Sequence, residues 1–214
     1  MDFAVFLGDE KTLIYKKGQG LVLNEPSMTA HVDGKIISVG KSAIKFVNDP
    51  SVSFYPIVSH GYIQSVENAS VFLREMFKKV GKAPTCLICI PSSLDTMALN
   101  NYKTAFFTAG AIDVEFVPQV VTSAIAGGYD PMSVEAILST VIEGDCADIA
   151  IIRSGEIIDG GTLNSLDKFT EAKSRLLREY PKVKIYDGGR LESATGAGKL
   201  LGNEMLIRKI VELN

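Results

Sequence analysis

Two cysteines, Cys86 and Cys89, have the C-x-x-C spacing that can bind a metal or form a redox disulfide. They lie inside an apolar run that is typical of a buried strand, in which residues three apart point to opposite faces. We therefore predict two buried structural cysteines, and an inert Cys146, which stands alone. Because His31 and His60 are far apart in the sequence and no ligand set surrounds them, no metal site is expected.

A glycine-rich segment, 196–199, ends in Gly-Lys as the phosphate-binding P-loop does. The P-loop also needs an earlier glycine, where Ser193 stands, and a hydroxyl ligand for magnesium, where Leu200 stands. We therefore predict no P-loop. Ser92 and Ser93 follow a strand but lack the G-x-S-x-G context of a hydrolase nucleophile, so we expect them to cap a helix.

The composition excludes several classes of protein. The chain has 214 residues, of which 46% are hydrophobic and 22% charged, as in an ordinary globular protein and not in a disordered one. A net charge of −3 gives no strong attraction to nucleic acid. Three cysteines are too few for a disulfide framework, and the sequence shows no signal peptide or 18-residue apolar run. We therefore expect a cytoplasmic location.

The hydrophobic pattern predicts elements that must position any site. Alternating and all-apolar runs predict strands at 3–7, 12–15, 21–23, 29–32, 35–39, 53–58, 86–90, 112–117, 147–152, 156–158 and 183–186. Helical spacing predicts helices at 66–80, 91–109, 120–127, 165–180, 194–201 and 204–213, with a short helix at 41–47. Hairpins followed by alternating helices and strands favour an α/β fold with mixed sheets.

Asp130-Pro131 is the best internal boundary in this pattern. It divides the chain into a first domain, 1–130, with a small hairpin insertion at about 27–58, and a second domain, 131–214. The second domain is short of strands for an independent unit. We therefore expect its closing helix, 204–213, to pack back on the first domain.

Several segments in unbroken order resemble the MreB/Mbl family of bacterial actin homologues. The clearest is the opening, in which Leu7-Gly8 is followed by the sequences TLIY at 12–15 and GQGLVLNEPS at 18–27. Weaker matches lie at 34–40, 88–92, 109–111, 124–128, 150–158 and 194–201. The resemblance implies an actin-like and ribonuclease-H-like fold, complete in its first half. The second half is shortened, because the family's insertion subdomain is missing.

The family binds ATP between its two halves, and its first motif is a hairpin with an acidic residue and a small-residue turn that holds the phosphates. The resemblance places Phe6 at the acidic position, and Gly8, Asp9, Glu10, Lys11 and Thr12 in the turn. Such a turn needs free backbone N–H groups and no negative side chain. We therefore expect Asp9 and Glu10 to point into the phosphate position.

The family's second and third motifs are also altered in this sequence. A catalytic Glu followed by Pro is expected where the sequence reads Val117-Pro118-Gln119, so Gln119 marks a position without an acid. An Asp-x-Gly-x-Gly-Thr-Thr hairpin aligns with 141–147, where Val141 replaces the leading Asp. Gly144 and Asp145 lie in its turn, and Cys146 replaces a hydroxyl. The loss of all three motifs should abolish hydrolysis.

The sequence therefore predicts a non-catalytic pseudo-ATPase without catalytic residues, cofactor or metal, which acts by protein–protein contacts in bacterial cell-shape or cytoskeletal machinery. The alternative is an actin-like protein that retains ATP binding or weak ATPase activity. A relative of Hsp70 chaperones or sugar kinases is less favoured, because the acids that those enzymes need are missing.

The expected partner is another protein, with a full-length MreB-like filament or a second copy in a closed homodimer as candidates, and not nucleic acid. Family members bind membranes through an apolar loop before the central strand or through an amphipathic N-terminal helix. Here the loop is short, 81–85, and the first strand begins at residue 3, so direct membrane binding is not expected.

Overall fold

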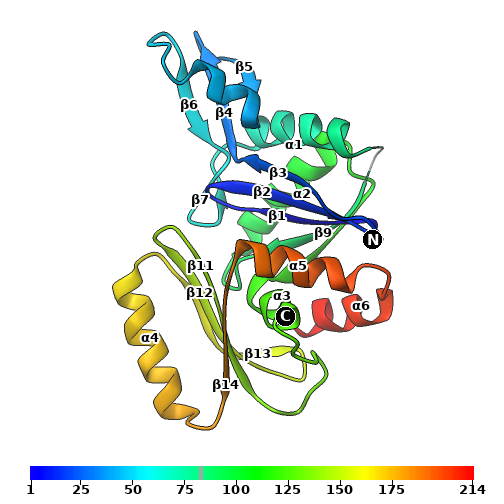
Figure 1. The fold of residues 1–214 in the computed structure, drawn as a ribbon, viewed down its shortest axis with the longest axis vertical. Helices are drawn as coiled ribbons and strands as arrows, with labels where there is room; N and C mark the ends of the chain where they lie inside the picture. The colour runs from blue at the N-terminus through cyan, green and yellow to red at the C-terminus, as the bar shows by residue number, and fades with distance from the viewer. Residues whose placement is uncertain (82–83) are drawn as a thin grey trace.

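The structure is a computed structural model that describes residues 1–81 and 84–214. It has two α/β halves, one above the other in Figure 1, with a small sheet projecting from the first half. Both halves are mixed sheets flanked by helices, as the sequence predicts.

The sheet of the first half has the strand order β10-β9-β1-β2-β3. Its strands are β1 (Phe3–Leu7), β2 (Lys11–Lys16), β3 (Gly20–Pro26), β9 (Thr85–Ile90) and β10 (Asp113–Pro118). β1 is antiparallel to β2 and parallel to β9, which is parallel to β10. The carboxyl ends of β1, β9 and β10 therefore meet at one edge of the sheet, which is the edge that faces the second half.

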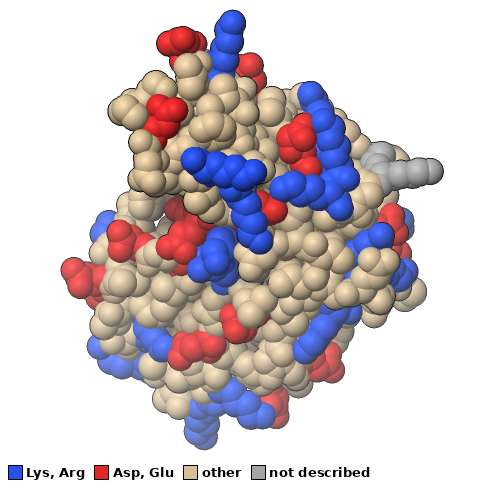
Figure 2. All heavy atoms as spheres, turned by 45° about the horizontal axis from the view of Figure 1, so that its top comes forward, with Lys and Arg blue, Asp and Glu red and all other residues tan. Residues whose placement is uncertain are grey.

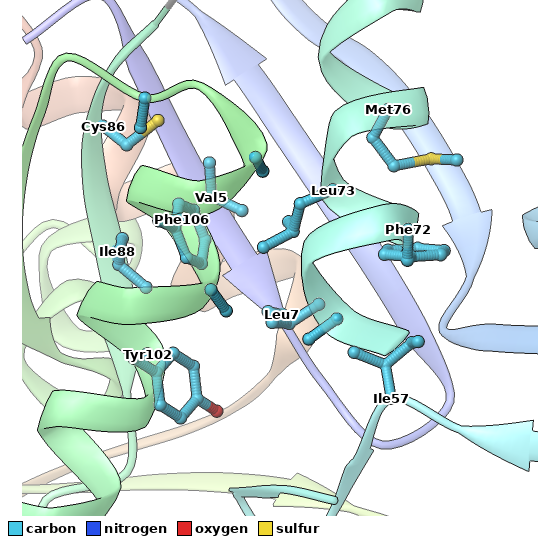
Figure 3. Close-up of a cluster of buried hydrophobic side chains, with 14 of the residues drawn as sticks. Val5, Leu7, Ile57, Phe72, Leu73, Met76, Cys86, Ile88, Tyr102 and Phe106 are labelled. Carbon is cyan, nitrogen blue, oxygen red and sulfur yellow. The ribbon is translucent and has the colours of Figure 1, made fainter. Parts of the chain in front are cut away.

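Both faces of this sheet are covered, which is why β1 is apolar at every position. Val5 and Leu7 pack against helices α1 (Val66–Val80) and α2 (Thr96–Ala109), in the cluster of Figure 3. Phe6 faces the opposite side, towards the second half. Cys86 and Cys89 divide between the same two faces and are buried, as predicted. Burial raises the pKa of the Cys89 thiol to about 11, so it stays protonated at neutral pH.

The predicted helix at 66–80 is confirmed, with the Ser65 hydroxyl accepting from the Asn68 N–H at its start. The start predicted for the next helix is wrong. α2 begins at Thr96, and the carboxylate that caps it belongs to Asp95. Ser92 and Ser93 precede the helix and bond to the second half instead.

A small sheet with the order β5-β4-β6 occupies the predicted insertion. Its elements are β4 (Met28–Val32), β5 (Lys35–Val39), the 3-10 helix η1 (Gly40–Phe46) and β6 (Ser53–Pro56). Asp33 and Gly34 form the turn of its hairpin with φ values of 49° and 74°, the left-handed conformation that this residue pair tolerates. A two-stranded ribbon, β7 (Val58–Ser59) and β8 (Tyr62–Ile63), leads back to α1.

The sheet of the second half has the order β13-β12-β11-β14. Its strands are β11 (Ile137–Glu143), β12 (Cys146–Arg153), β13 (Glu156–Leu163) and β14 (Lys184–Gly189), and α4 (Leu166–Glu179) covers its outer face. The sequence pattern missed β11, which is one of the two inner strands. Its interior positions Ser139 and Thr140 are polar yet fully buried, so they interrupt the apolar run that marks a buried strand. The Ser139 hydroxyl donates to the Val120 carbonyl and Thr140 to Asp187, which satisfies them.

Helices α3 (Gln119–Ala126) and α5 (Arg190–Leu200) cross between the two halves, as Figure 1 shows. The crossing is close because Gly196 of α5 lies directly on the Thr122 carbonyl of α3, where a Cβ would overlap the oxygen. The Thr122 and Ser193 hydroxyls form a buried hydrogen bond of 2.8 Å beside this contact. The last helix, α6 (Glu204–Leu213), packs against β10 of the first half and against β13 and α5.

One hydrophobic cluster spans both halves. Its members from the first half include Ala4, Phe6, Leu13, Leu87, Cys89 and Val117, and those from the second half include Ile137, Val141, Ala150, Ile152, Ala197, Leu200, Ile207 and Ile210. The boundary predicted at 130/131 therefore separates the two large sheets along the chain, but the hydrophobic core continues from one half into the other. Whether either half folds independently stays a prediction.

The surface shown in Figure 2 mixes acidic and basic side chains, with no uninterrupted basic face on this side. Within residues 1–81 and 84–214, no helix is long and apolar enough to cross a membrane. The loop 81–85, where a family member could contact a membrane, includes Lys82 and Ala83, which lie outside the described residues.

Candidate functional site

Two β-hairpins face each other where the halves meet. The first, β1–β2, turns at 8–10, and the second, β11–β12, turns at Gly144 and Asp145. A cavity of about 20 Å³ lies between them, lined by residues that include Phe6, Gly8, Asp9, Gln119, Val141 and Glu143. This volume accommodates about one water molecule. The sequence motifs expected to form a nucleotide cleft are therefore adjacent, and the cavity between their two turns is water-sized. A separate pocket of about 310 Å³, lined by residues of both halves that include His60, Ser93 and Thr162, shares Cys146 with this cavity.

Glu143, the last residue of β11, places its carboxylate in this space. Its Oε1 accepts a hydrogen bond from the Glu10 N–H at 3.3 Å. Gly8 lies against the carboxylate so closely that a Cβ at residue 8 would collide with both oxygens. The side chain of Glu143 is only 10% exposed. One amide of the first hairpin turn, that of Glu10, is thus bonded to a carboxylate that the second hairpin supplies.

Arg190, the first residue of α5, provides the positive charge at this point. Its guanidinium binds the carboxylate of Glu10 and lies 3.5 Å from that of Glu143. The first hairpin, the second hairpin and α5 are therefore joined by one guanidinium between two carboxylates. The Arg190 contact lowers the pKa of Glu10, a hydrogen bond with the guanidinium being the main cause.

Asp9 does not extend into the position of Glu143. Its carboxylate accepts from the backbone N–H groups of His60 and Gly61, at 2.6 and 3.2 Å. The Tyr102 hydroxyl holds the same turn by donating to the Gly61 carbonyl at 3.0 Å. His60 adopts φ = 52°, so this turn is in the left-handed region and directs its amides towards the first hairpin.

A second carboxylate, Asp148 of β12, closes the other side of the junction. It accepts from the backbone N–H of Ser92 at 2.9 Å, from the Ser92 hydroxyl, and from the Thr162 hydroxyl at 3.2 Å. The Ser93 hydroxyl accepts from the Thr162 N–H at 3.1 Å. These serines therefore connect the halves and do not cap a helix. Burial raises the pKa of Asp148, although these hydrogen bonds oppose the shift.

The structure brings together some, but not all, of the site residues that the sequence singled out. Phe6 and Val141 both line the cavity and are buried in the shared core. Gln119, at the start of α3, also lines the cavity. Gly144 (φ = 58°) and Asp145 form the turn of the second hairpin and do not line the cavity.

Three residues at the first turn also differ from expectation. Lys11 begins β2, and the Thr12 hydroxyl is buried in a 2.9 Å hydrogen bond with Ser27, away from the cavity. Glu10 points outwards to Arg190, with a side chain 58% exposed. The carboxylates of Asp9 and Glu10 therefore bond to other groups, whereas Glu143 meets the backbone of the first turn.

The sequence pattern missed Glu143, Arg190 and Asp148. Glu143 lies inside the segment that aligns with the third motif and replaces one of its glycines, which is the available signal. Arg190 and Asp148 have no such signal, because the carboxylates that Arg190 pairs with and the Ser92 that bonds Asp148 lie more than 45 residues away in the chain. Only the packing of the two halves brings these groups together.

The residues at this site do not fit a magnesium triphosphate. The Glu143 carboxylate lies against the first turn and accepts from the Glu10 amide, the cavity between the turns is water-sized, and Phe6 and Val141 offer no oxygen ligand. Among the residues that the structure describes, no three His, Cys, Asp or Glu side chains are grouped to hold a metal ion.

The buried charge at Glu143 leads to a pH prediction. Burial, the largest cause, raises the pKa of Glu143; Asp9 adds to the shift, whereas Arg190 and the amides of Asp9 and Glu10 oppose it. Because the folded pKa is raised, stability from this group is complete below about pH 4.5 and is lost as the pH rises through the folded pKa. The loss is about 1.4 kcal/mol for each tenfold by which folding increases the proton affinity of the carboxylate. Relative to the parent, Glu143→Gln should therefore gain stability as the pH rises.

Thermal unfolding of both proteins between pH 4 and 8 measures this difference. Glu135→Gln is the matched control, since Glu135 is exposed and its carboxylate lies 3.7 Å from the exposed Lys184. The difference in Tm between the parent and Glu135→Gln should change little across this pH range. If the difference in Tm between the parent and Glu143→Gln also changes little with pH, the raised pKa of Glu143 is contradicted.

Comparison with known proteins gives a consistent result. The family model described as "MreB/Mbl protein" matches residues 1–186. The chain is 28% identical over 190 residues to the cell shape-determining protein Mbl of Bacillus subtilis, covering 84% of this chain and 57% of the relative. It is also 28% identical over 188 residues to MreB of Escherichia coli, covering 80% and 54%. The chain thus spans little more than half the length of these relatives.

A solved structure, MreB5 of Spiroplasma citri bound to ADP, superposes with a TM-score of 0.69 at 25% identity. The match covers 94% of this chain and 62% of that chain. The same protein bound to AMPPNP also has a TM-score of 0.69, at 23% identity. The two halves and their junction therefore share the fold of a protein that was solved with a nucleotide bound.

Proposed function

Because the chain belongs to the MreB/Mbl family, we propose that it is a non-catalytic member, a pseudo-ATPase that acts through protein–protein contacts in the cell-shape cytoskeleton. The curated relatives are named cell shape-determining proteins, and this name supports the process. A filament of full-length MreB-like subunits is the partner that fits the family best, with a second copy of the chain as the other candidate.

The position of the Glu143 carboxylate carries the proposal. Phosphoryl transfer depends on bound metal, a phosphate cradle and an oriented water at the same place. Here the Glu10 amide of the first turn is bonded to Glu143, and the position of the water-orienting acid is held by the amide Gln119. Restoring one acid alone should therefore not restore turnover.

Thermal unfolding with and without magnesium ADP or ATP tests the proposal. A ligand that binds only the folded state at 100 times its dissociation constant stabilises it by about 2.7 kcal/mol, which corresponds to a rise in Tm of about 5–10 °C for a chain of this size. We expect no rise for this protein at millimolar nucleotide. MreB5 of Spiroplasma citri, solved with ADP, is the positive control.

A saturable rise in Tm would instead support the alternative, a protein that retains nucleotide binding. Phosphate release from ATP by the purified protein, lost on Gly8→Asp, would refute the non-catalytic assignment outright. Gly8 suits this control because its Cα borders the cavity, so a side chain there removes the remaining space.

A further inference from the structure

We infer that Glu143 is an internal substitute for a bound phosphate, which holds the two halves together without nucleotide. This inference rests on the proposed function, since it explains what replaces ATP at the junction. Three features of the junction support it: the donors that the carboxylate meets, the space that it fills, and the charge that balances it.

The donors are the backbone amides of the first hairpin turn. A turn with convergent N–H groups binds an anionic oxygen, and it does not distinguish a phosphate oxygen from a carboxylate oxygen by charge. The Glu10 N–H meets Glu143 Oε1 at 3.3 Å. The acceptor comes from the other half of the chain, so this hydrogen bond also links the halves.

The space is matched to this one side chain. Gly8 lacks the Cβ that would collide with the Glu143 oxygens, and the remaining cavity holds about one water molecule. Glu143 ends β11, where the strand meets the turn of its hairpin, so the backbone of the second sheet fixes where its side chain begins. The Glu143 carboxylate therefore occupies the place where an external anion would have to lie to accept from the Glu10 amide.

The balancing charge is the guanidinium of Arg190. It pairs with Glu10 of the first half and lies 3.5 Å from Glu143 of the second, so it offsets two carboxylates that would otherwise repel each other. Asp9 is turned away, with its oxygens on the amides of His60 and Gly61. The junction therefore contains its own anion and its own cation.

Replacement of the missing carboxylate by a small anion tests this inference. Glu143→Ala should have a lower Tm than the parent, and it should expose the amides of the first turn in a cavity of carboxylate size. Sodium formate should then raise the Tm of the variant by about 3 °C at ten times its dissociation constant, and inorganic phosphate should also raise it. The parent should show no rise beyond that given by sodium chloride at equal ionic strength.

Glu135→Ala is the matched control, because it removes an exposed carboxylate from the same half. Its response to formate and phosphate should equal that of the parent. Equal responses from Glu143→Ala and Glu135→Ala would overturn the inference.

A second variant covers the case in which Glu143→Ala does not fold. Glu143→Asp keeps the charge but shortens the side chain by one methylene, so its carboxylate no longer reaches the Glu10 N–H that meets Glu143 Oε1 at 3.3 Å. The Glu10 amide should then exchange with solvent deuterons at least about tenfold faster than in the parent. Unchanged exchange at this amide would overturn the inference. The Tm of the parent with magnesium ATP is a separate result: a rise there refutes the proposed function, whereas failure of the formate rescue refutes only the role of Glu143.

Discussion

Replacing Gly196 by alanine lowers the free energy of unfolding by about 3 kcal/mol and the Tm by about 9 °C, because the added methyl group meets the backbone of α3. A Cβ at residue 196 would overlap the Thr122 carbonyl oxygen and approach the Ala126 nitrogen. A carbonyl in a helix cannot rotate away, so the two helices must separate. Alanine favours helix over glycine by about 1 kcal/mol, so an effect of propensity alone would have the opposite sign.

Gly198→Ala is the matched control on the same helix. A Cβ at residue 198 would meet the ring of Tyr15, with a nearest atom at 2.9 Å, and a side chain can shift where a backbone cannot. We expect a clearly smaller loss for this variant in thermal or urea unfolding. If the two substitutions cost the same, or if Gly196→Ala stabilises the protein, the close crossing of α3 and α5 is refuted.

The second large effect is expected when the chain is cut between the halves. The fragment 131–214 should be unfolded or insoluble alone, because its apolar residues complete a core whose other side belongs to the first half. Ile207 and Ile210 of α6 are 2% and 0% exposed in the whole chain, and α6 lies partly on β10. Without the first half, both would be exposed to water.

The intact chain should correspondingly unfold in one transition. Calorimetry compares the calorimetric and van't Hoff enthalpies of the whole chain, and a two-dimensional amide spectrum reports on the fragment. Mixing the fragment with 1–130 is the control. If the two pieces associate, the shared core forms again and the amide peaks of the fragment should become dispersed. Two separate transitions in the whole chain, or dispersed peaks from the fragment alone, would contradict this prediction.

The local sequence is sufficient to predict the elements whose conformation depends only on residues close to one another in the chain. The face of α1, the Asp33-Gly34 turn and the opposed placement of Cys86 and Cys89 all follow from residue spacing and from conformations that depend on near neighbours. The sequence alone also shows that acids are missing at Phe6, Gln119 and Val141, because an absent functional group can be read without a structure.

The predictions from sequence are wrong where the role of a side chain depends on a partner that is distant in the chain. The sequence predicts a helix cap at Ser92, the usual role of serine after a strand, whereas its partner in the structure is Asp148 of β12. The buried hydroxyls of β11 conceal that strand, because their acceptors lie on α3 and β14. A buried hydroxyl is compatible with a core only when it has a hydrogen-bond partner. The local sequence pattern does not show which residue that partner is.

Which acidic side chain bonds to the first hairpin turn at the junction is determined only by the tertiary structure. The sequence determines that negative side chains stand in the family's phosphate-binding segments, but not which of them reaches the amides. Asp9 turns to the His60 and Gly61 amides and Glu10 turns to Arg190, which leaves Glu143 to fill the space. The physical reason is that hydrogen bonds and ion pairs form between groups that are close in space, and α3 and α5 set that distance when they bring the two halves into contact.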